Sequence, residues 1–359
     1  MPLADLSLSR SGLDKVSDDR GVTGLMDRLL RDPTTSLLPV LDGRAPLHDG
    51  NGGSVNGGSV NGGSVNDGSV NDGDHLGGPA RAPALRTVVG DAAAALVEAL
   101  GGAGALAAGG TDPSSEPVAV LLGRFPADDP RAPGALVGLL LPEGASTGWP
   151  AGPSEDLRGV GALLDDTDAG ALTEAVALQH WHRSHPRCPR CGGPTRVAAA
   201  GHARVCTLDD STHHPRHDPA VIMTVTDPAG RLLLGHQGRW PQGLFSAFAG
   251  FVEPGESLEQ AVARELLEEA GVRATSVTYL GSQPWPFPAS LMVAFHAETD
   301  DTEAVPDGEE ITEARWFDRD GLRAAVAAGE VTVPPTVSVA RRLVERWLGG
   351  PVDQDGTWR

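Results

Sequence analysis

The chain has 359 residues, of which 40% are hydrophobic, so it is long enough to form two domains with separate cores. Its formal net charge is −20, and this acidic balance argues against general binding to a nucleic acid backbone, which needs a basic face. An anionic substrate must therefore be attracted locally, by metal ions or by a few arginines.

Three features of the chain indicate its location. The first residues, MPLADLSLSRSGLDK, contain no basic stretch followed by an apolar one and therefore do not form a signal peptide. The least polar stretch, residues 92–110, is mostly Ala and Gly and is interrupted by Glu98, so it is too weakly hydrophobic for a membrane span. Three cysteines are too few for a disulfide scaffold. We expect a cytoplasmic protein with no membrane contact.

The N-terminal half reads as one interrupted α/β domain, residues 1–185. Residues 118–122 and 135–141 are expected to be short strands, and residues 169–181 a helix with a mainly apolar face. Residues 49–78 repeat NGGSV and NDGSV, which cannot bury enough apolar surface to offset the entropy of ordering. We expect this insertion to be disordered, and we find no catalytic pattern in the domain.

A short segment rich in Cys, His, Gly and Pro follows at residues 186–216. The sequence Cys-Pro-Arg-Cys-Gly-Gly resembles a zinc knuckle, and a third cysteine follows fifteen residues later; the three are Cys188, Cys191 and Cys206. A Cys₃His zinc site completed by His213 is chemically reasonable. Asp209 or Asp210 is a weaker candidate for the fourth ligand. A metal-free ribbon and a redox Cys-x-x-Cys remain alternatives.

Residues 217–348 contain the principal chemical signal, followed by a polar tail at 349–359. Within GFVEPGESLEQAVARELLEEAGV, Ser257 and Gln260 form the pattern of a capping box, which predicts that a helix begins there. Gly271 suits the left-handed residue that ends a helix. The apolar residues of this helix form a stripe suited to packing on a sheet. A second helix is expected at residues 337–348.

Three glutamates lie within one turn of the predicted helix: Glu265, Glu268 and Glu269. The carboxylates repel one another unless a cation compensates them, and Mg²⁺ or Mn²⁺ prefers such oxygen ligands. Arg264 can hold the carboxylate of Glu256 in the preceding turn through a bidentate pair. Three glutamates on one helix turn are by themselves more often a solvated helix face. Only the pattern of the whole segment can indicate a metal site.

The whole segment resembles the Nudix box, in which Gly, Glu and Arg-Glu-apolar-x-Glu-Glu-x-Gly recur at fixed spacing. The matching positions are Gly250, Glu256, Arg264, Glu265, Leu266, Glu268, Glu269, Gly271 and Val272. The resemblance implies an α/β/α sandwich around a mixed sheet and hydrolysis of a nucleoside diphosphate linked to another group. It further implies that Glu256, Glu265, Glu268 and Glu269 hold Mg²⁺ or Mn²⁺, and that Arg264 belongs to the same catalytic set.

A second motif narrows the expected substrate. The sequence SQPWPFPAS resembles the SQPWPFPxS signature of the NADH pyrophosphatases, a family within the Nudix superfamily. We interpret it as a proline-stiffened loop whose aromatic residues shape a nucleotide pocket. The expected substrate contacts in it are Ser282, Gln283, Trp285, Phe287 and Ser290.

The same resemblance assigns three further residues. Glu310 lies where the family places an acidic metal ligand outside the box, and Phe251 where it places an aromatic that stacks on a substrate ring. His214 replaces the Tyr or Phe that the family usually has before Pro-Arg. Histidine stacks more weakly, and its charge varies with pH, which puts the stacking role of this position in doubt.

The resemblance implies hydrolysis of NAD(H) to nicotinamide mononucleotide and AMP, with removal of NAD caps from RNA 5′ ends as a further activity. It also implies a homodimer. One alternative is a Nudix hydrolase for another dinucleotide, such as ADP-ribose or a diadenosine polyphosphate. A second is a non-catalytic nucleotide-binding module, against which the intact glutamate trio argues.

Overall fold

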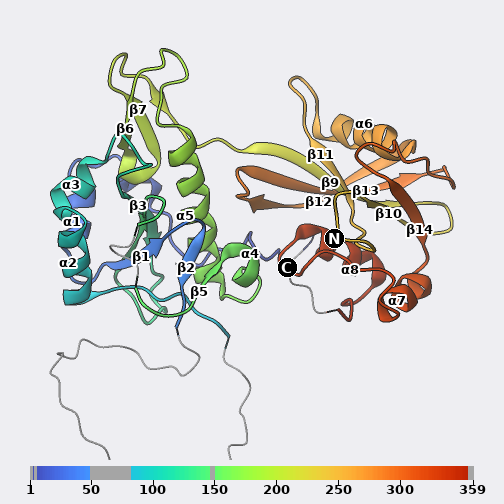
Figure 1. The fold of residues 1–359 in the computed structure, drawn as a ribbon, viewed down its shortest axis with the longest axis horizontal. Coiled ribbons are helices and arrows are strands. Elements are labelled where there is room, and N and C mark those ends of the chain that lie inside the picture. Colours follow the sequence, from blue (N-terminus) through green and yellow to red (C-terminus); the bar gives the residue numbers. More distant parts are fainter. Residues whose placement is uncertain (1–2, 4–5, 49–81, 146–149, 355–359) are drawn as a thin grey trace, which may run out of the picture.

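The computed structural model describes residues 3, 6–48, 82–145 and 150–354, so the predicted repeat insertion at 49–78 lies outside the described residues. The chain forms two lobes, which lie side by side in Figure 1. The N-terminal lobe carries a small ribbon of strands on one end. The C-terminal lobe contains the predicted acidic helix.

The N-terminal lobe is built on a three-stranded sheet in the order β1-β4-β3. Strand β1 (Ser36–Val40) runs parallel to β4 (Ala135–Leu140), and β3 (Val118–Arg124) runs antiparallel to β4. One face packs against α1 (Leu25–Arg31), α2 (Gly90–Ala99) and α3 (Gly102–Ala108), and the other against α5 (Asp166–Ser184). Because both faces are covered, the strands are buried almost throughout, which explains their continuous apolar sequence.

The predicted helix at 169–181 is longer than expected. Helix α5 begins at Asp166, because the side chain of Asp165 accepts a hydrogen bond from the backbone N–H of Asp168. Among the described residues no single helix is both long and apolar enough to cross a membrane. Helices α2 and α3 reach that length and composition only as a pair, and the pair is bent by 68°.

Smaller elements complete this half of the molecule. Strand β2 (Arg44–Pro46) pairs with β5 (Ser154–Asp156), and α4 (Leu157–Val160) follows directly; two 3₁₀ turns lie at Ser17–Asp19 and Ala199–Gly201. The ribbon is a sheet of β6 (Thr195–Ala198), β7 (Ala203–Cys206) and β8 (Thr212–His213). It is fixed to α5 by the His182 ring, whose Nε2 lies 2.9 Å from the carbonyl oxygen of Gly201.

The C-terminal lobe is an α/β/α sandwich around a mixed six-stranded sheet, as the sequence predicted. The strand order is β12-β13-β9-β10-β14, and β11 pairs with β9. These strands are β9 (Asp218–Thr226), β10 (Leu232–His236), β11 (Phe248–Phe251), β12 (Ala274–Trp285), β13 (Ser290–Thr299) and β14 (Glu313–Phe317). Among the strand pairs described for this sheet, β9 with β13 is parallel and the others are antiparallel.

Alternation along β9 divides the core of this lobe into two layers. Val221, Met223 and Val225 face α6 (Leu258–Ala270), whereas Ile222 faces α8 (Val339–Leu348). Helix α7 (Arg319–Ala327) packs with α8 around a third apolar cluster. The expected helix at 337–348 begins at Val339, because Ser338 caps it by accepting a hydrogen bond from the N–H of Ala340.

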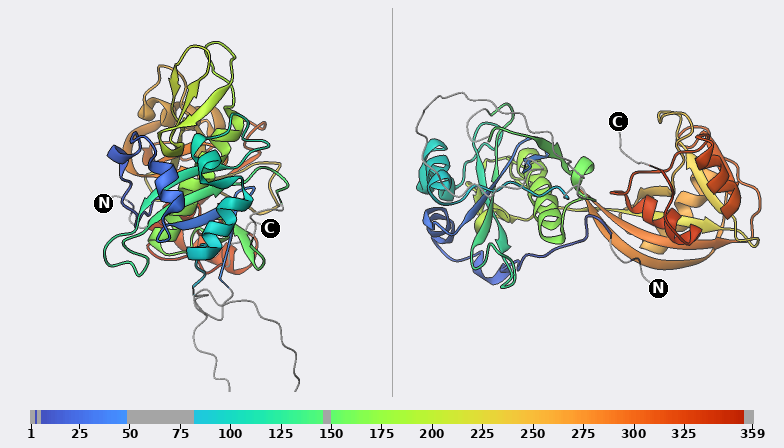
Figure 2. Two further views of the ribbon diagram at one scale, coloured as in Figure 1. Left: turned by 90° about the vertical axis from the view of Figure 1, so that its left-hand side faces the viewer. Right: turned by 90° about the horizontal axis from the view of Figure 1, so that it is seen from below.

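We expected the SQPWPFP segment to be a loop. In the structure it forms the end of a strand and a turn. Ser282 to Trp285 pair with Ser290 to Val293 of β13, and only residues 286–289 turn the chain. Pro284 fits because β12 is an edge strand, where a missing N–H leaves no ladder bond broken. Figure 2 shows this end of the sheet directed at the N-terminal lobe.

The motif joins the two lobes. Trp285 and Phe287 pack against the core of the N-terminal lobe, and the guanidinium of Arg158 in α4 lies 4.1 Å from the Phe287 ring centroid and 5.7 Å from that of Trp285. The N-terminal segment also reaches the C-terminal lobe, where Leu6 is buried in the layer between the sheet and α8. The N-terminal segment therefore contributes to the core of the C-terminal lobe.

Replacing Gln283 with leucine is expected to destabilise the protein. The Gln283 side chain is fully buried and donates to the Val337 carbonyl oxygen at 2.9 Å. Leucine leaves that carbonyl unsatisfied, so we expect the free energy of unfolding to fall by about 1–3 kcal/mol. Denaturant unfolding followed by tryptophan fluorescence measures the change. The exposed Gln242→Leu is the control; equal stability of the two variants would contradict the prediction.

Candidate active site

The acidic helix α6 is positioned by its two caps. Ser257 and Gln260 form the predicted capping box, and Gly271 ends the helix with a φ of 66°, in the left-handed region that glycine favours. The helix packs Ala261, Val262 and Leu266 onto the sheet. This packing fixes the rotation of the helix, so that the glutamates lie along its edge beside β11.

Arg264 is the hub of the carboxylate cluster. Its Nε and Nη2 donate to the two carboxylate oxygens of Glu256 at 2.8 and 2.9 Å, which is the predicted bidentate pair. Its Nη1 donates to Glu265 at 2.8 Å and to Glu268 at 3.0 Å. A further bond to the Phe251 carbonyl oxygen ties the helix to β11. These contacts hold the pKa of Glu256 below its usual range, mainly through the Arg264 hydrogen bonds.

Glu269 receives no such compensation. Its side chain is buried, and its Oε2 has no hydrogen-bond partner among the described residues. Burial, followed by repulsion from Glu265 and Glu310, raises the pKa of Glu269 to about 8. The pKa of Glu265 is raised as well, first by burial, although Arg264 opposes the shift. Glu269 therefore holds a proton at neutral pH unless a cation replaces it.

Glu310 reaches this cluster from a distant part of the chain. The loop between β13 and β14 docks on the end of α6, where the N–H of Val305 donates to the Ala270 carbonyl oxygen at 2.8 Å. The loop then turns on Asp307, whose carboxylate accepts from the N–H groups of Glu310 and Ile311. The structure thus brings the predicted fifth carboxylate next to Glu265 and Glu269, where it acts on the pKa of both.

Gly250, the first residue of the box, makes room for Glu265. A Cβ atom at Gly250 would lie 1.8–2.2 Å from the carboxylate atoms of Glu265, well inside van der Waals contact. The carboxylate therefore lies directly over the backbone of β11. A side chain at this position would displace it from Glu269.

These residues fit a divalent cation. Arg264 pairs with three of the five carboxylates in the cluster, and the orphaned, buried Oε2 of Glu269 is the group that a cation would satisfy; the five are Glu256, Glu265, Glu268, Glu269 and Glu310. Hard oxygen donors are the ligands that Mg²⁺ and Mn²⁺ prefer. The exposed Glu268 is ion-paired with Arg264 through the same Nη1 that contacts Glu265.

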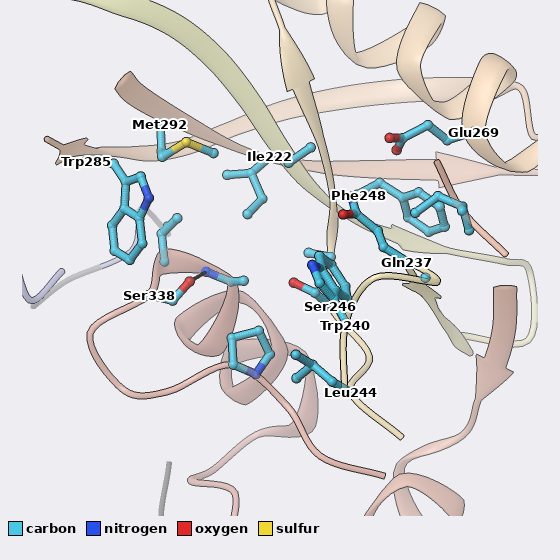
Figure 3. A pocket seen from close by; sticks show the side chains of 17 residues that line it. Ile222, Gln237, Trp240, Leu244, Ser246, Phe248, Glu269, Trp285, Met292 and Ser338 are labelled. Atoms are coloured by element: carbon cyan, nitrogen blue, oxygen red, sulfur yellow. Dashed lines mark hydrogen bonds between the residues drawn. The ribbon is translucent and has the colours of Figure 1, made fainter. Parts of the chain in front are cut away.

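A cavity of about 170 Å³ opens beside Glu269, between the sheet and the start of α8. Such a volume would hold roughly ten waters, and it therefore suits a small-molecule fragment rather than a single water. Glu269 lies at one end of it and Trp285 with Met292 at the other (Figure 3). The lining between them is mostly apolar and includes Trp240 and Phe248.

The structure separates the predicted substrate residues into groups. Trp285 lines the cavity, whereas Gln283 is buried beside Val337, and Phe287 packs against the N-terminal lobe. The remaining predicted contacts differ in exposure: Ser290 is buried, Ser282 is half-buried and bonded through its carbonyl oxygen to Ser9, and Phe251 and His214 are exposed.

Several residues that line the cavity were not predicted from the sequence. Gln237 and Trp240 come from the turn after β10, and Ser338 and Val339 from the start of α8. The sequence HQGRWPQG offered one signal, a tryptophan in a polar turn rich in Gly and Pro. No local pattern could have indicated that the start of α8 folds over the same face.

The cysteines gather at the far end of the ribbon. Donor atoms of Cys188, Cys191, Cys206 and Asp209 all lie within 4.8 Å of one another. His213, the predicted fourth ligand, is outside this group and contacts Cys188 alone among the thiols, with Nε2 3.3 Å from the sulfur. The three cysteines are free thiols.

Replacing Gly250 with alanine should weaken binding of divalent cations. The added methyl group displaces the Glu265 carboxylate, so we expect Mn²⁺ affinity to fall by about tenfold or more, which is the typical effect of disturbing the support of a metal ligand. Titration of Mn²⁺ by calorimetry or electron paramagnetic resonance measures the loss. Gly104→Ala, which meets no neighbouring atom, is the matched control. Unchanged affinity in Gly250→Ala would refute the steric argument.

Comparison with known proteins supports the two motifs. Residues 216–335 match the model of the NUDIX domain, and residues 183–214 match that of the NADH pyrophosphatase zinc ribbon domain. The chain is 47% identical over 202 residues to a protein of Mycobacterium bovis named NAD-capped RNA hydrolase NudC, and 46% identical to its counterpart in Mycobacterium tuberculosis. A human protein named NAD-capped RNA hydrolase NUDT12 is 40% identical over 197 residues.

These matches cover part of each protein. The mycobacterial matches span 54% of this chain and 64% of the relatives, and the human match spans 52% and 43%. The residues that match the two family models contain the ribbon, the acidic helix and the SQPWPFP segment. Residues 183–335 thus match a NADH pyrophosphatase zinc ribbon followed by a NUDIX domain, and the chain spans less than two thirds of the length of these relatives.

Proposed function

We propose that the protein hydrolyses the pyrophosphate bond of NAD(H) to nicotinamide mononucleotide and AMP, with Mg²⁺ or Mn²⁺. One observation carries the proposal: the buried carboxylate of Glu269 lies at one end of an aromatic-lined cavity, and Trp285 of the SQPWPFP segment lies at the other. Each half of a dinucleotide has a corresponding arrangement, with a ring at one end and the charged pyrophosphate at the other. The names of the relatives add removal of NAD caps from RNA as a further activity.

The residues divide the work as follows. Glu265 and Glu269 would supply buried oxygen ligands to the cation, and Glu310 would add a third from the loop between β13 and β14. Arg264 and Glu256 lock the turn before α6 to the helix, so that the ligands stay in place. Bound divalent cations neutralise the two phosphate charges and lower the pKa of water. Water attacks one phosphorus, the bridging P–O bond breaks, and the proton passes to a carboxylate, for which the exposed Glu268 is our candidate.

The remaining parts of the proposal concern assembly and environment. We infer three units: an α/β domain at 1–185, a zinc ribbon at 186–216 and a catalytic domain at 217–348. We also propose that the protein is a homodimer, as the resemblance implies. The zinc-ribbon match and the converging thiols support structural zinc. A reducing compartment such as the cytoplasm would keep these thiols free to bind metal. ADP-ribose, a diadenosine polyphosphate, or nucleotide binding without turnover are the competing functions.

We expect Glu269→Gln to abolish most of the turnover without destabilising the fold. Glutamine keeps the shape of the side chain and resembles the protonated carboxyl that burial already favours at neutral pH, but it is a poor cation ligand. With NADH and Mn²⁺, formation of AMP should slow by roughly 100-fold or more, because metal ligation supplies several kcal/mol at the transition state.

The control is Glu259→Gln, an exposed glutamate of the same helix, which should keep full activity. A chelator should stop the wild-type reaction, and Mn²⁺ should restore it. Full turnover in Glu269→Gln, or in the presence of chelator, would exclude the assigned role. Tight binding of NADH with no AMP formed would favour the non-catalytic alternative.

Trp240→Ala is expected to weaken substrate binding more than catalysis. Trp240 lines the cavity, and loss of a stacked ring costs about 1–3 kcal/mol, so KM for NADH should rise roughly tenfold or more while kcat changes less. The control is Tyr279→Ala, an exposed aromatic that is not among the lining residues. Comparing kcat/KM for NADH, NAD⁺, ADP-ribose and a diadenosine polyphosphate identifies the substrate; a preference for ADP-ribose would replace our choice.

A further inference from the structure

The ribbon presents two knuckles of the same shape around its cysteines. In the first, Cys188-Pro-Arg-Cys191, the N–H of Arg190 donates to the sulfur of Cys188 at 3.4 Å. In the second, which begins at Cys206, the N–H of Leu208 donates to the sulfur of Cys206 at the same distance. The backbone therefore turns in the same way after Cys188 and after Cys206. Because the spacing is also the same, Asp209 occupies in the second knuckle the place that Cys191 occupies in the first.

The distances between the donor atoms fit a tetrahedral metal site. The sulfurs of Cys191 and Cys206 are 3.5 Å apart, and the Cys188 sulfur is 3.9 Å from Oδ2 of Asp209. Ligands 2.0–2.3 Å from zinc are separated by roughly 3.3–3.8 Å along the edges of a tetrahedron. These two of the six edges are therefore within about 0.1 Å of the lengths expected for zinc, and all six are within 4.8 Å.

The other oxygen of Asp209 is engaged elsewhere, and this orients the carboxylate. Oδ1 accepts hydrogen bonds from the N–H of Ser211 at 3.0 Å and from its hydroxyl at 2.5 Å. These bonds leave Oδ2 directed at the thiols. A carboxylate held by two donors on one oxygen is a preoriented, monodentate ligand.

His213 is placed differently. Its Nε2 lies 3.0 Å from the Ser211 hydroxyl and 3.3 Å from the Cys188 sulfur. It does not belong to the group whose donor atoms are all mutually close. The imidazole therefore approaches one corner of the cluster from outside, where an N–H can stabilise the Cys188 thiolate.

We propose that the ribbon binds Zn²⁺ through Cys188, Cys191, Cys206 and Asp209, with His213 outside the coordination shell as a hydrogen-bond donor to Cys188. This assignment replaces our sequence expectation of a Cys₃His site. An oxygen donor in place of a fourth thiolate makes the site less favourable for zinc, since thiolates are the softer ligands. The assignment does not depend on the hydrolase activity, because the ribbon site and the carboxylate cluster share no residue.

The test compares isosteric variants of the full chain, read by metal content and by absorption rather than by activity. Wild-type protein should contain one zinc per chain by elemental analysis. Asp209→Asn keeps the Ser211 turn but removes the anionic ligand, so it should lose zinc to a chromogenic chelator about tenfold faster or more. Asp210→Asn, the matched neighbour, should behave as wild type. His213→Gln keeps an N–H donor and should retain zinc.

Asp209→Cys supplies the gain-of-ligand test. In the Co²⁺-substituted protein the thiolate-to-metal charge-transfer absorption scales with the number of bound thiolates. The change from three to four should raise it by about one third, and zinc release should slow. His213→Gln should leave this spectrum unchanged.

Three results would overturn the proposal. Loss of zinc from His213→Gln together with retention in Asp209→Asn would assign the fourth position to histidine. Wild-type protein that binds neither zinc nor Co²⁺ would show a metal-free ribbon. A Cys191–Cys206 disulfide found by mass spectrometry in freshly isolated protein would point to redox chemistry.

Discussion

Crowding of like charges around Arg264 is the constraint on which the C-terminal lobe depends. One guanidinium binds Glu256, Glu265 and Glu268, and Glu269 is left buried with an unpartnered oxygen. A helix does not accumulate such charge for stability, because a buried, unpaired carboxylate costs free energy. A bound cation would offset this cost. Without one, burial and the neighbouring carboxylates raise the pKa of Glu269, which disfavours its charged form.

The surrounding fold keeps this unfavourable cluster in place. Packing of α6 on β9 and β13 fixes which edge of the helix carries the glutamates, and the absence of a side chain at Gly250 lets Glu265 settle onto β11. The loop anchored at Val305 then adds Glu310. Each of these contacts is remote in sequence from the others, so the geometry of the cluster belongs to the whole lobe.

The two lobes are joined through the segment that also shapes the cavity. Trp285 faces the cavity on one side and the N-terminal core on the other, and Arg158 lies against its ring. The N-terminal lobe therefore supports one wall of the cavity, although it supplies none of the carboxylates. This position gives a physical reason for an N-terminal domain that carries no catalytic pattern of its own.

The sequence by itself determined the features that depend on local spacing. The capping box at Ser257, the left-handed Gly271 and the pairing of Arg264 with Glu256 follow from residues close together in the chain, whereas the sandwich around a mixed sheet was implied by the resemblance to the Nudix box. Only the tertiary structure decided what depends on contacts between distant segments. It ended β12 at Trp285 rather than in a free loop, buried Gln283 against Val337, and brought the start of α8 to the cavity. It also left His213 outside the group formed by the three thiols and Asp209, because the path of the backbone after Cys206, and not residue type alone, decides which side chain reaches the thiols.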